Sequence, residues 1–367
     1  MNIEQTNASQ GRPSSRLSYL DWMRGLAAVV MLQGHVFHSF AAKDVREGGA
    51  FVLSQFFGGM PPAIFLFLTG VTLAFLMDSS ERKGLPGGAK VAAVVRRSGY
   101  LFAMAFLFRL QLWLFAWPHS PWTDLFKVDI LNCMGLAILA MSAMTVFTTL
   151  DRVRLCAVLG TAIAAVSPVV SAIDWSGAPL LLKTYLAPSY DYFSFFPWAS
   201  YLAFGVSAGS LLRVAKSEEN IERAIQWAAV LGMGAAAGAY YLSSIPFSIY
   251  SNSEFWLNSP AQIVIKLGVI LTLLAFAYVW NRWVVRDSWN WLRQVGTTSL
   301  LVYWVHIELV YGRWVWWWKE NLSVPATLAA AVAVVGLMVL LSTVRTRWAE
   351  CREWLEATLN RPLGQED

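Results

Sequence analysis

Apolar runs of about 20 residues recur along almost the whole chain, and each is long enough to cross the hydrocarbon core of a bilayer. Of the 367 residues, 57% are hydrophobic and 14% are charged, which is well below the charged share of a soluble domain. The sequence therefore predicts an all-α, polytopic membrane helix bundle of about ten transmembrane helices. The expected spans are residues 18–41, 52–77, 91–116, 128–149, 154–173, 191–213, 224–244, 260–281, 296–315 and 324–344.

The basic residues between these spans predict the orientation of the chain. Lys and Arg, including Arg82, Lys83 and Arg345, gather in the segments that are cytoplasmic if both termini are inside. We therefore expect an integral membrane protein with both termini in the cytoplasm. Residues 1–17 and 347–367 would be cytoplasmic tails, and residues 18–346 one transmembrane domain.

The first expected span carries ionisable residues, which are costly in lipid and are functional candidates by default. Asp21 and Arg24 are three residues apart and share a face, and His35 lies roughly 16 Å further along the axis near His38. A cation near the cytosol with a histidine deeper in the bundle suits a long, thin, phosphate-bearing substrate such as coenzyme A. The alternative is an Asp21–Arg24 pair that only fixes the helix, with a structural histidine.

Two further groups of polar residues fall at later spans. Arg109 near the end of the third span and Asp129 at the start of the fourth are expected to pair, with Asn132 on the same face as Asp129. In the ninth span, Tyr303 and His306 share a face while Glu308 points elsewhere. Both groups are compatible with a site wall, and both also with purely structural contacts. A tryptophan-rich segment after the ninth span suits an interfacial aromatic belt or a platform for sugar rings.

Some functions are disfavoured by the sequence. The net charge of +5 comes from basic residues at helix ends, with no basic stripe or RNA-binding motif, so no nucleic-acid partner is expected. The four histidines lack the spacing of a metal set, and the three cysteines form no C-x-x-C, so no metal site is expected.

The chain resembles the transmembrane acyltransferases of the heparan-α-glucosaminide N-acetyltransferase group, especially the bacterial branch, which is related to the acyltransferase-3 membrane proteins. The first-span pattern is Leu20-Asp21, Arg24-Gly25-Leu26 and His35. The other matching motifs, in chain order, are Phe65-Leu66-Phe67-Leu68-Thr69-Gly70-Val71, Arg96-Arg97, Val128 to Leu136, Phe196-Pro197-Trp198 with Gly205, and Tyr303-Trp304-Val305-His306.

This resemblance implies transfer of an acetyl group from cytosolic acetyl-CoA, as co-substrate, to an amine or hydroxyl of a glycan or amino sugar beyond the membrane. It also implies a lipid-embedded bundle that is commonly a homodimer. Lysosomal members use a histidine in the loop after the first span, whereas residues 39–60 contain none, so the base is expected at His35.

Each candidate residue then has an expected role. His35 would be the general base, because histidine titrates near physiological pH, and His306 or Asp129 would orient base or acceptor. The predicted CoA contacts are Arg24, Arg96 and Arg97, and the predicted acceptor contacts are Arg109, Asn132, Tyr303 and His38. The main alternative is a small-molecule or ion transporter, in which the same buried charges line a pathway. No internal half-repeat typical of many transporters is visible in the sequence.

Overall fold

The computed structural model describes residues 18–251, 253–286 and 288–359. Helices form the regular structure, and no β-strand is present in this part of the chain beyond an isolated bridge between Ala41 and Leu322. The predicted all-α class is confirmed. The predicted tail at residues 1–17 lies outside the described residues, while helix α13 continues to Leu359, into the segment predicted as the carboxyl-terminal tail.

The chain divides into two compact units. Residues 1–58 and 283–367 form one, which we call the terminal unit, and residues 59–282 form the other, the central unit. Each unit is described by itself.

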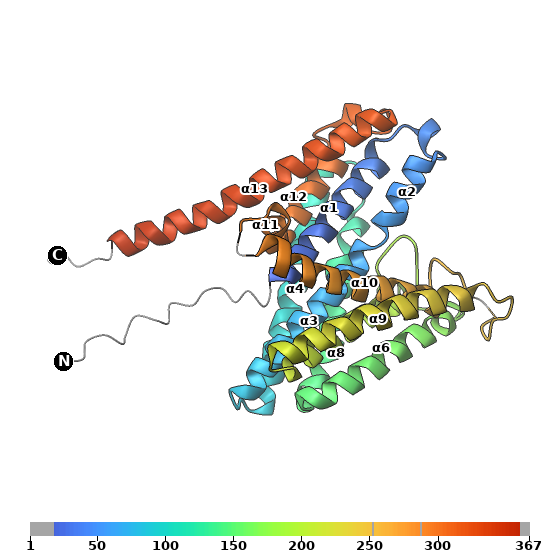
Figure 1. The fold of residues 1–367 in the computed structure, drawn as a ribbon. Coiled ribbons are helices and arrows are strands. Elements are labelled where there is room, and N and C mark those ends of the chain that lie inside the picture. Colours follow the sequence, from blue (N-terminus) through green and yellow to red (C-terminus); the bar gives the residue numbers. More distant parts are fainter. Residues whose placement is uncertain (1–17, 252, 287, 360–367) are drawn as a thin grey trace. The chain divides into compact units, whose positions relative to one another are not determined.

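The terminal unit is built around α1, against which α2, α11, α12 and α13 all pack (Figure 1). Its helices are α1 (Ser18–Phe40), α2 (Gly49–Gly58), α11 (Trp291–Thr297), α12 (Ser299–Tyr311) and α13 (Val324–Leu359), with short 3-10 turns η2 (Lys43–Val45) and η6 (Trp316–Trp318).

Two glycines set the crossing of α1 and α11. A Cβ atom on Gly25 would overlap the backbone carbonyl of Leu292, and one on Gly296 would overlap the carbonyl of Asp21. Only glycine permits so close a backbone approach, which is the usual device for tight helix packing in membranes. The crossing holds the amino-terminal end of α1 in place.

The central unit contains the remaining long helices (Figure 1). They are α3 (Pro61–Arg82), α4 (Gly87–Ala116), α5 (Ile130–Met141), α6 (Thr149–Ser171), α7 (Leu180–Leu186), α8 (Phe195–Val214), α9 (Glu218–Ser243) and α10 (Pro260–Trp280). The 3-10 turns η3 (Trp122–Phe126) and η4 (Ser142–Val146) flank α5, and the π-helical turn η5 (Asn281–Val285) follows α10.

The closest packing in the central unit joins α3 to α8, and α8 in turn packs on α6. A Cβ atom on Gly70 would overlap the carbonyl oxygen of Leu202, and one on Gly205 would overlap that of Phe67. This reciprocal pair explains why Gly70 and Gly205 occur in the motifs singled out from the sequence. It also sets the carboxyl-terminal ends of both helices beside the start of α6.

Seven segments of the described chain are long and apolar enough to cross a membrane: Gly49–Arg82, Gly87–Ala116, Trp122–Val146, Thr149–Ser171, Phe195–Val214, Pro260–Val285 and Val324–Trp348. All ten expected spans contain a helix, but the number ten is not confirmed. The three expected spans that are not among these seven segments correspond to α1, α9 and α12. Polar residues lower the hydropathy of α1, charges open α9, and α12 has only 13 residues.

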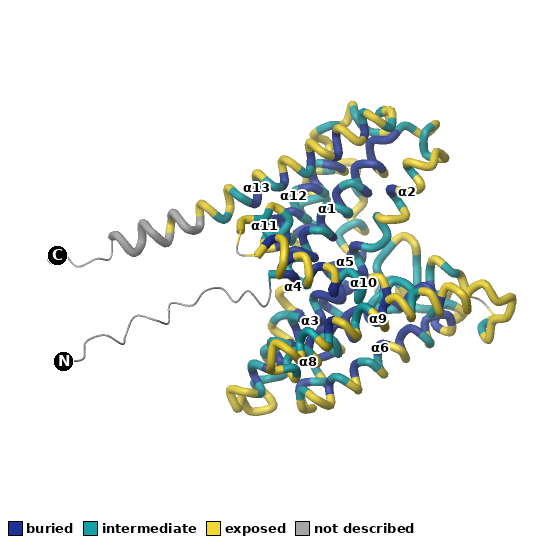
Figure 2. Tube along the Cα trace, in the orientation of Figure 1, coloured by how far each residue is buried: buried dark blue, intermediate teal, exposed yellow. Residues whose placement is uncertain are grey.

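Many large apolar residues of both units are exposed, and exposed positions recur along the helices of each unit (Figure 2). Val158 on α6, Leu231 on α9 and Val332 on α13 are all more than half exposed. A soluble protein rarely exposes so many large apolar side chains, whereas lipid solvates them. The chain is therefore an integral membrane protein.

The second expected span, residues 52–77, is interrupted in the structure. Helix α2 ends at Gly58 and α3 begins at Pro61, and the break also divides the two compact units. The sequence between them, Gly58-Gly59-Met60-Pro61-Pro62, explains the interruption, because proline lacks an amide donor and favours the first turn of a new helix.

Candidate active site

The amino-terminal part of α1 carries the ion pair that its spacing allowed. Arg24 Nη1 donates to Asp21 Oδ1 at 2.9 Å, and both side chains are partly exposed. The pair occupies one of the several N–H donors of the guanidinium. A structural contribution of Arg24 is therefore evident, and its contact with CoA phosphates stays a prediction.

Further along α1, His35 meets His306 of α12. Their Nδ1 and Nε2 atoms lie 2.9 Å apart, and the ring planes are inclined by only 14°. The His306 side chain is fully buried, whereas His35 keeps partial exposure. Two candidate residues that are 271 positions apart in the sequence thus form one direct contact.

The backbone of α12 determines how this pair carries its protons. His306 Nδ1 lies 2.8 Å from the carbonyl oxygen of Val302, which can only accept a hydrogen bond. Neutral His306 therefore carries its proton on Nδ1 and presents an unprotonated Nε2 to His35. His35 must donate from Nδ1, which leaves its own Nε2 with a free lone pair. The arrangement makes His35 Nε2 a base.

Helices α1 and α12 run in the same direction where they touch. His35 contacts His306 and Ser39 Oγ donates to the carbonyl oxygen of Val310 at 2.8 Å, so both contacts have the same sequence offset of 271. A constant offset is the signature of parallel helices in register. Parallel packing is what the predicted topology requires of a first and a ninth span.

Tyr311 stands beside both histidines of α1. Its hydroxyl lies 3.2 Å from His38 Nδ1, and its ring meets that of His35 edge-on with centroids 5.5 Å apart. His38 is exposed and His35 is only partly exposed, so the two histidines differ in environment although they lie one turn apart. The sequence analysis did not single out Tyr311, which is the last residue of α12.

The two other polar residues of α12 lie as their spacing predicted. The Tyr303 ring meets the His306 ring at a centroid distance of 5.9 Å. Glu308 instead is buried and accepts a hydrogen bond from Trp314 Nε1 at 3.1 Å, which fixes the start of the tryptophan-rich segment. Tyr303 therefore belongs to the histidine group.

In the central unit, Asp129 caps the amino terminus of α5. Its Oδ1 accepts from the backbone N–H groups of Leu131 and Asn132, and the Asn132 side chain accepts from the Asp129 N–H in return. Asp129 Oδ2 also lies 3.3 Å from Arg109 Nε. The expected Arg109–Asp129 pair is thus formed, together with a capping box that satisfies helix donors.

The Asn132 side chain reaches a residue that sequence analysis missed. Its Nδ2 donates to the hydroxyl of Tyr185 on α7 at 3.1 Å. Tyr185 lies in a short connecting segment without any motif, so nothing in the sequence distinguished it. Asn132 thereby links the α5 cap to α7.

The two neighbouring arginines of α4, Arg96 and Arg97, have different environments. Arg97 is partly buried, and its Nη2 donates to Thr72 Oγ1 of α3 at 3.2 Å. Arg96 points to an exposed position. Only Arg97 is fixed against a neighbouring helix by a contact that could position it for a ligand.

A lysine inside an expected span was also overlooked. Lys266 of α10 donates to the carbonyl oxygen of Gly59 at 3.1 Å, and its ammonium lies over the Trp198 ring, 5.3 Å from the centroid. An ionisable residue within the apolar 260–281 run was the signal that could have identified it. Its two contacts join α10 to α8 and to Gly59, two residues before the start of α3.

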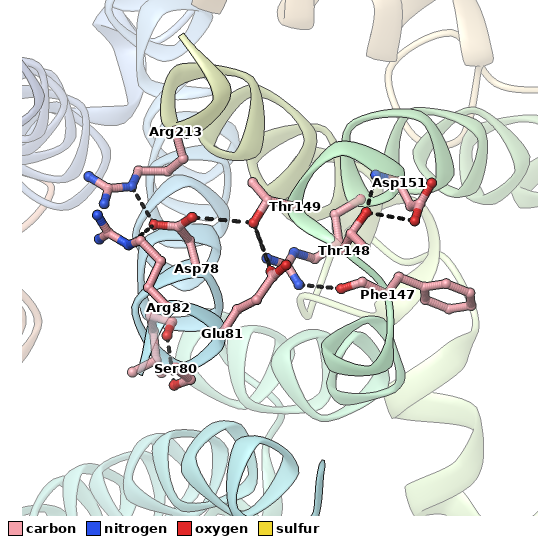
Figure 3. A network of polar contacts seen from close by, with 11 residues as sticks. Asp78, Ser80, Glu81, Arg82, Phe147, Thr148, Thr149, Asp151 and Arg213 are labelled. Atoms are coloured by element: carbon pink, nitrogen blue, oxygen red, sulfur yellow. Dashed lines mark hydrogen bonds and ion pairs between the residues drawn. The ribbon is translucent and has the colours of Figure 1, made fainter. Parts of the chain in front are cut away.

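A larger network lies where α3 and α8 end and α6 begins (Figure 3). Arg152, only 1% exposed, contacts Glu81 Oε2 at 2.8 Å and donates to the carbonyl oxygen of Phe147 at 2.6 Å. Thr149 Oγ1 lies 2.9 Å from Glu81 Oε2 and 3.3 Å from Asp78 Oδ1, and so connects the two carboxylates. These charges entered the sequence analysis only as indicators of topology, or not at all.

The structure thus divides the predicted residues between the two compact units. His35, His38, Tyr303 and His306 gather in the terminal unit, where Arg24 lies nearer the start of α1. Arg109 with Asp129 and Asn132, and separately Arg97, belong to the central unit.

The family model described as heparan-alpha-glucosaminide N-acetyltransferase, catalytic, matches residues 16–246. The match covers more than half of the 367 residues. The chain belongs to this family. The heparan-alpha-glucosaminide N-acetyltransferase family predicted from the motifs is therefore confirmed, and with it a membrane protein of acetyltransferase type. The matched region contains His35, Arg97 and Asp129, while His306 lies beyond it. No curated protein matches the chain.

Proposed function

We propose that this chain transfers an acetyl group from cytosolic acetyl-CoA to an amine or hydroxyl of a glycan on the far side of a bacterial inner membrane. Family membership supports the acetyl-transfer chemistry. The observation that carries the assignment of the site is the His35–His306 contact, because it provides a base with a defined proton arrangement.

In the proposed reaction, the acceptor nitrogen or oxygen attacks the thioester carbonyl carbon while His35 Nε2 removes the acceptor proton. The carbon–sulfur bond then breaks, and the CoA thiolate takes up the proton that His35 removed, which restores the neutral base. As His35 becomes an imidazolium, its Nδ1–H donates more strongly to His306 Nε2, so the buried neighbour stabilises the charge that develops. The partial exposure of His35 leaves room for a reactant to approach.

His306 is proposed as a positioning residue rather than a second base. Its Nδ1 is engaged by the Val302 carbonyl and its Nε2 faces His35, so both ring nitrogens have partners. Asp129, the alternative orienting group, is engaged as a helix cap and by Arg109. These contacts support a structural role for Asp129.

The remaining candidates take the roles that the resemblance implies. Arg24, Arg96 and Arg97 would contact the phosphates of CoA, and His38, Tyr303, Arg109 and Asn132 would contact the acceptor. We also propose cytoplasmic termini and a homodimer. The parallel packing of α1 and α12 supports the topology, since both helices then enter from the cytoplasmic side.

Thermal stabilisation of the purified full-length protein tests the donor assignment. A ligand that binds only the folded state raises the melting temperature, so acetyl-CoA and CoA should each stabilise the protein while ATP at equal concentration does not. Acetyl transfer from labelled acetyl-CoA to glucosamine-terminated oligosaccharides would then test the acceptor class. If neither CoA species shifts the melting temperature at high concentration, the proposal is wrong and the transporter interpretation is favoured.

A further inference from the structure

One buried carboxylate at the end of α3 holds two arginines. Asp78 Oδ2 lies 2.6 Å from Arg213 Nε of α8 and 3.1 Å from Arg82 Nε of α3. The Asp78 side chain is 10% exposed, Arg213 30% and Arg82 63%. The Asp78 carboxylate thus holds the guanidiniums of Arg82 and Arg213, and the three side chains together keep a net positive charge.

Both guanidiniums bind Asp78 through Nε and leave their terminal nitrogens outward. Within the described residues, the Nη atoms of Arg82 and Arg213 make no hydrogen bond. Figure 3 shows the two groups next to each other, on the side of Asp78 away from Glu81. The paired Nη atoms therefore offer several N–H donors to a ligand on that side.

A third arginine, Arg97 of α4, contacts the same segment of α3. Thr72, Phe75 and Asp78 follow one another on α3 at intervals of three residues, so each is a surface neighbour of the next. Arg97 contacts Thr72, and the Arg213 guanidinium lies over the Phe75 ring at 5.6 Å. Thr72 and Asp78 are about 9 Å apart along the helix axis. Cations from α3, α4 and α8 thus line one short stretch of α3.

The neighbouring ion pair provides a contrast. Arg152 is 1% exposed, is matched by Glu81, and also binds Phe147 and Thr149. Its charge is balanced and inaccessible, which is typical of a structural ion pair. The Asp78 group instead has an excess of positive charge, and its two arginines remain accessible.

We propose that Arg82, Arg97 and Arg213 bind the phosphate groups of CoA, an assignment that rests on the proposed function. Guanidinium groups recognise phosphate oxygens by paired, charge-assisted hydrogen bonds. CoA carries a pyrophosphate and a separate ribose phosphate, which suits cations distributed over about two helical turns. The site adds Arg82 and Arg213 to the arginines expected from the sequence, and it lies beside the α3–α4 loop that the predicted topology places in the cytoplasm.

The test measures CoA affinity of full-length Arg82→Gln, Arg213→Gln and Arg213→Lys variants by titration calorimetry. Arg213→Gln should weaken CoA binding roughly tenfold, and the exposed Arg82→Gln less, because charge-assisted hydrogen bonds are lost. Lysine at position 213 keeps a positive partner for Asp78 but cannot form the paired hydrogen bonds of a guanidinium with a phosphate. We therefore expect an intermediate loss of CoA affinity for Arg213→Lys. In acetyl transfer, KM for acetyl-CoA should rise while kcat at saturating donor stays near the parent value.

The matched control is Arg223→Gln, which removes one positive charge from an exposed pair with Glu219 on α9 and should leave CoA affinity unchanged. If Arg213→Gln does not fold, Arg82→Gln and Arg213→Lys still decide the question. Unchanged CoA affinity in folded variants would overturn the inference while leaving the proposed function intact, and a parent that binds no CoA would overturn both. If the variants lose stabilisation by phosphatidylglycerol but bind CoA normally, the arginines hold lipid headgroups and the CoA assignment is wrong.

Discussion

His35 Nδ1 lies 2.9 Å from His306 Nε2, and this single contact joins the first helix of the chain to α12. The geometry is more informative than the presence of two histidines, because the Val302 carbonyl fixes the proton position on His306 and thereby that on His35. An isolated histidine could adopt either tautomer. Here the fold selects the one that exposes Nε2 as the proton acceptor.

Substitution of His35 is expected to abolish transfer without abolishing donor binding. His35→Ala should reduce the rate of acetyl transfer by about 10²–10⁴-fold, the usual contribution of a general base, while acetyl-CoA still raises the melting temperature. His38→Ala is the comparison variant, because it removes an exposed histidine one turn away whose Nδ1 lies 3.2 Å from the Tyr311 hydroxyl and whose proposed role is contact with the acceptor. Its effect should be much smaller. Near-parent transfer by His35→Ala, with loss in His38→Ala or His306→Ala, would show that another histidine is the base.

His306 should act through His35, and its substitutions can separate positioning from packing. His306→Leu removes the acceptor for His35 Nδ1–H and should lower kcat at least roughly tenfold, less than the loss of the base itself. His306→Gln can supply an acceptor oxygen near the same place and should recover part of the rate. The pH–rate profile distinguishes the two roles. The leucine variant changes the stability of the His35 imidazolium and so shifts the profile, whereas a change in packing alone would not. Equal rates and identical pH profiles in both variants would argue for a purely structural histidine.

The fold could be predicted from the sequence wherever a local signal existed. Apolar runs placed a helix in every expected span, and the wide exposure of Val158, Leu231 and Val332 is what a lipid-facing surface requires. The break at Gly59 was missed because a run of apolar residues hides a glycine–proline interruption when only mean hydropathy is considered.

For the site, contacts between residues three apart were predictable, because helix geometry alone determines them. Asp21–Arg24 and Asp129–Asn132 are of this kind. The His35–His306 contact required the register between α1 and α12, which depends on packing of the whole terminal unit. Arg213 and Asp78 are 135 residues apart, and nothing local in the sequence connects them.

Asp129 should prove to be a stabilising residue. Asp129→Ala removes the cap of α5 and leaves Arg109 without its partner, so we expect a loss of about 1–3 kcal/mol in stability. Asp129→Asn keeps a good capping oxygen and should recover part of that loss. Thermal unfolding of both variants measures the effect, and transfer rates per folded molecule should stay within a few-fold of the parent. A stable Asp129→Asn variant that has lost transfer would instead restore Asp129 as an orienting residue.

The two ends of α6 provide a sharp test of topology. Thr149 at its start contacts Glu81 near the α3–α4 loop, whereas Ser176 follows its far end, and a helix of 23 residues spans about 35 Å, enough to cross the hydrocarbon core. Because basic residues concentrate around Leu85, we expect a cysteine at position 85 to face the cytoplasm and one at position 176 to face outward. The measurement is labelling of intact cells with a membrane-impermeant maleimide in a variant without Cys133, Cys156 and Cys351. Cysteine at 176 should react from outside, and cysteine at 85 only after permeabilisation. The reverse pattern would invert the orientation, and would place the arginines around Asp78 on the side opposite to cytosolic CoA.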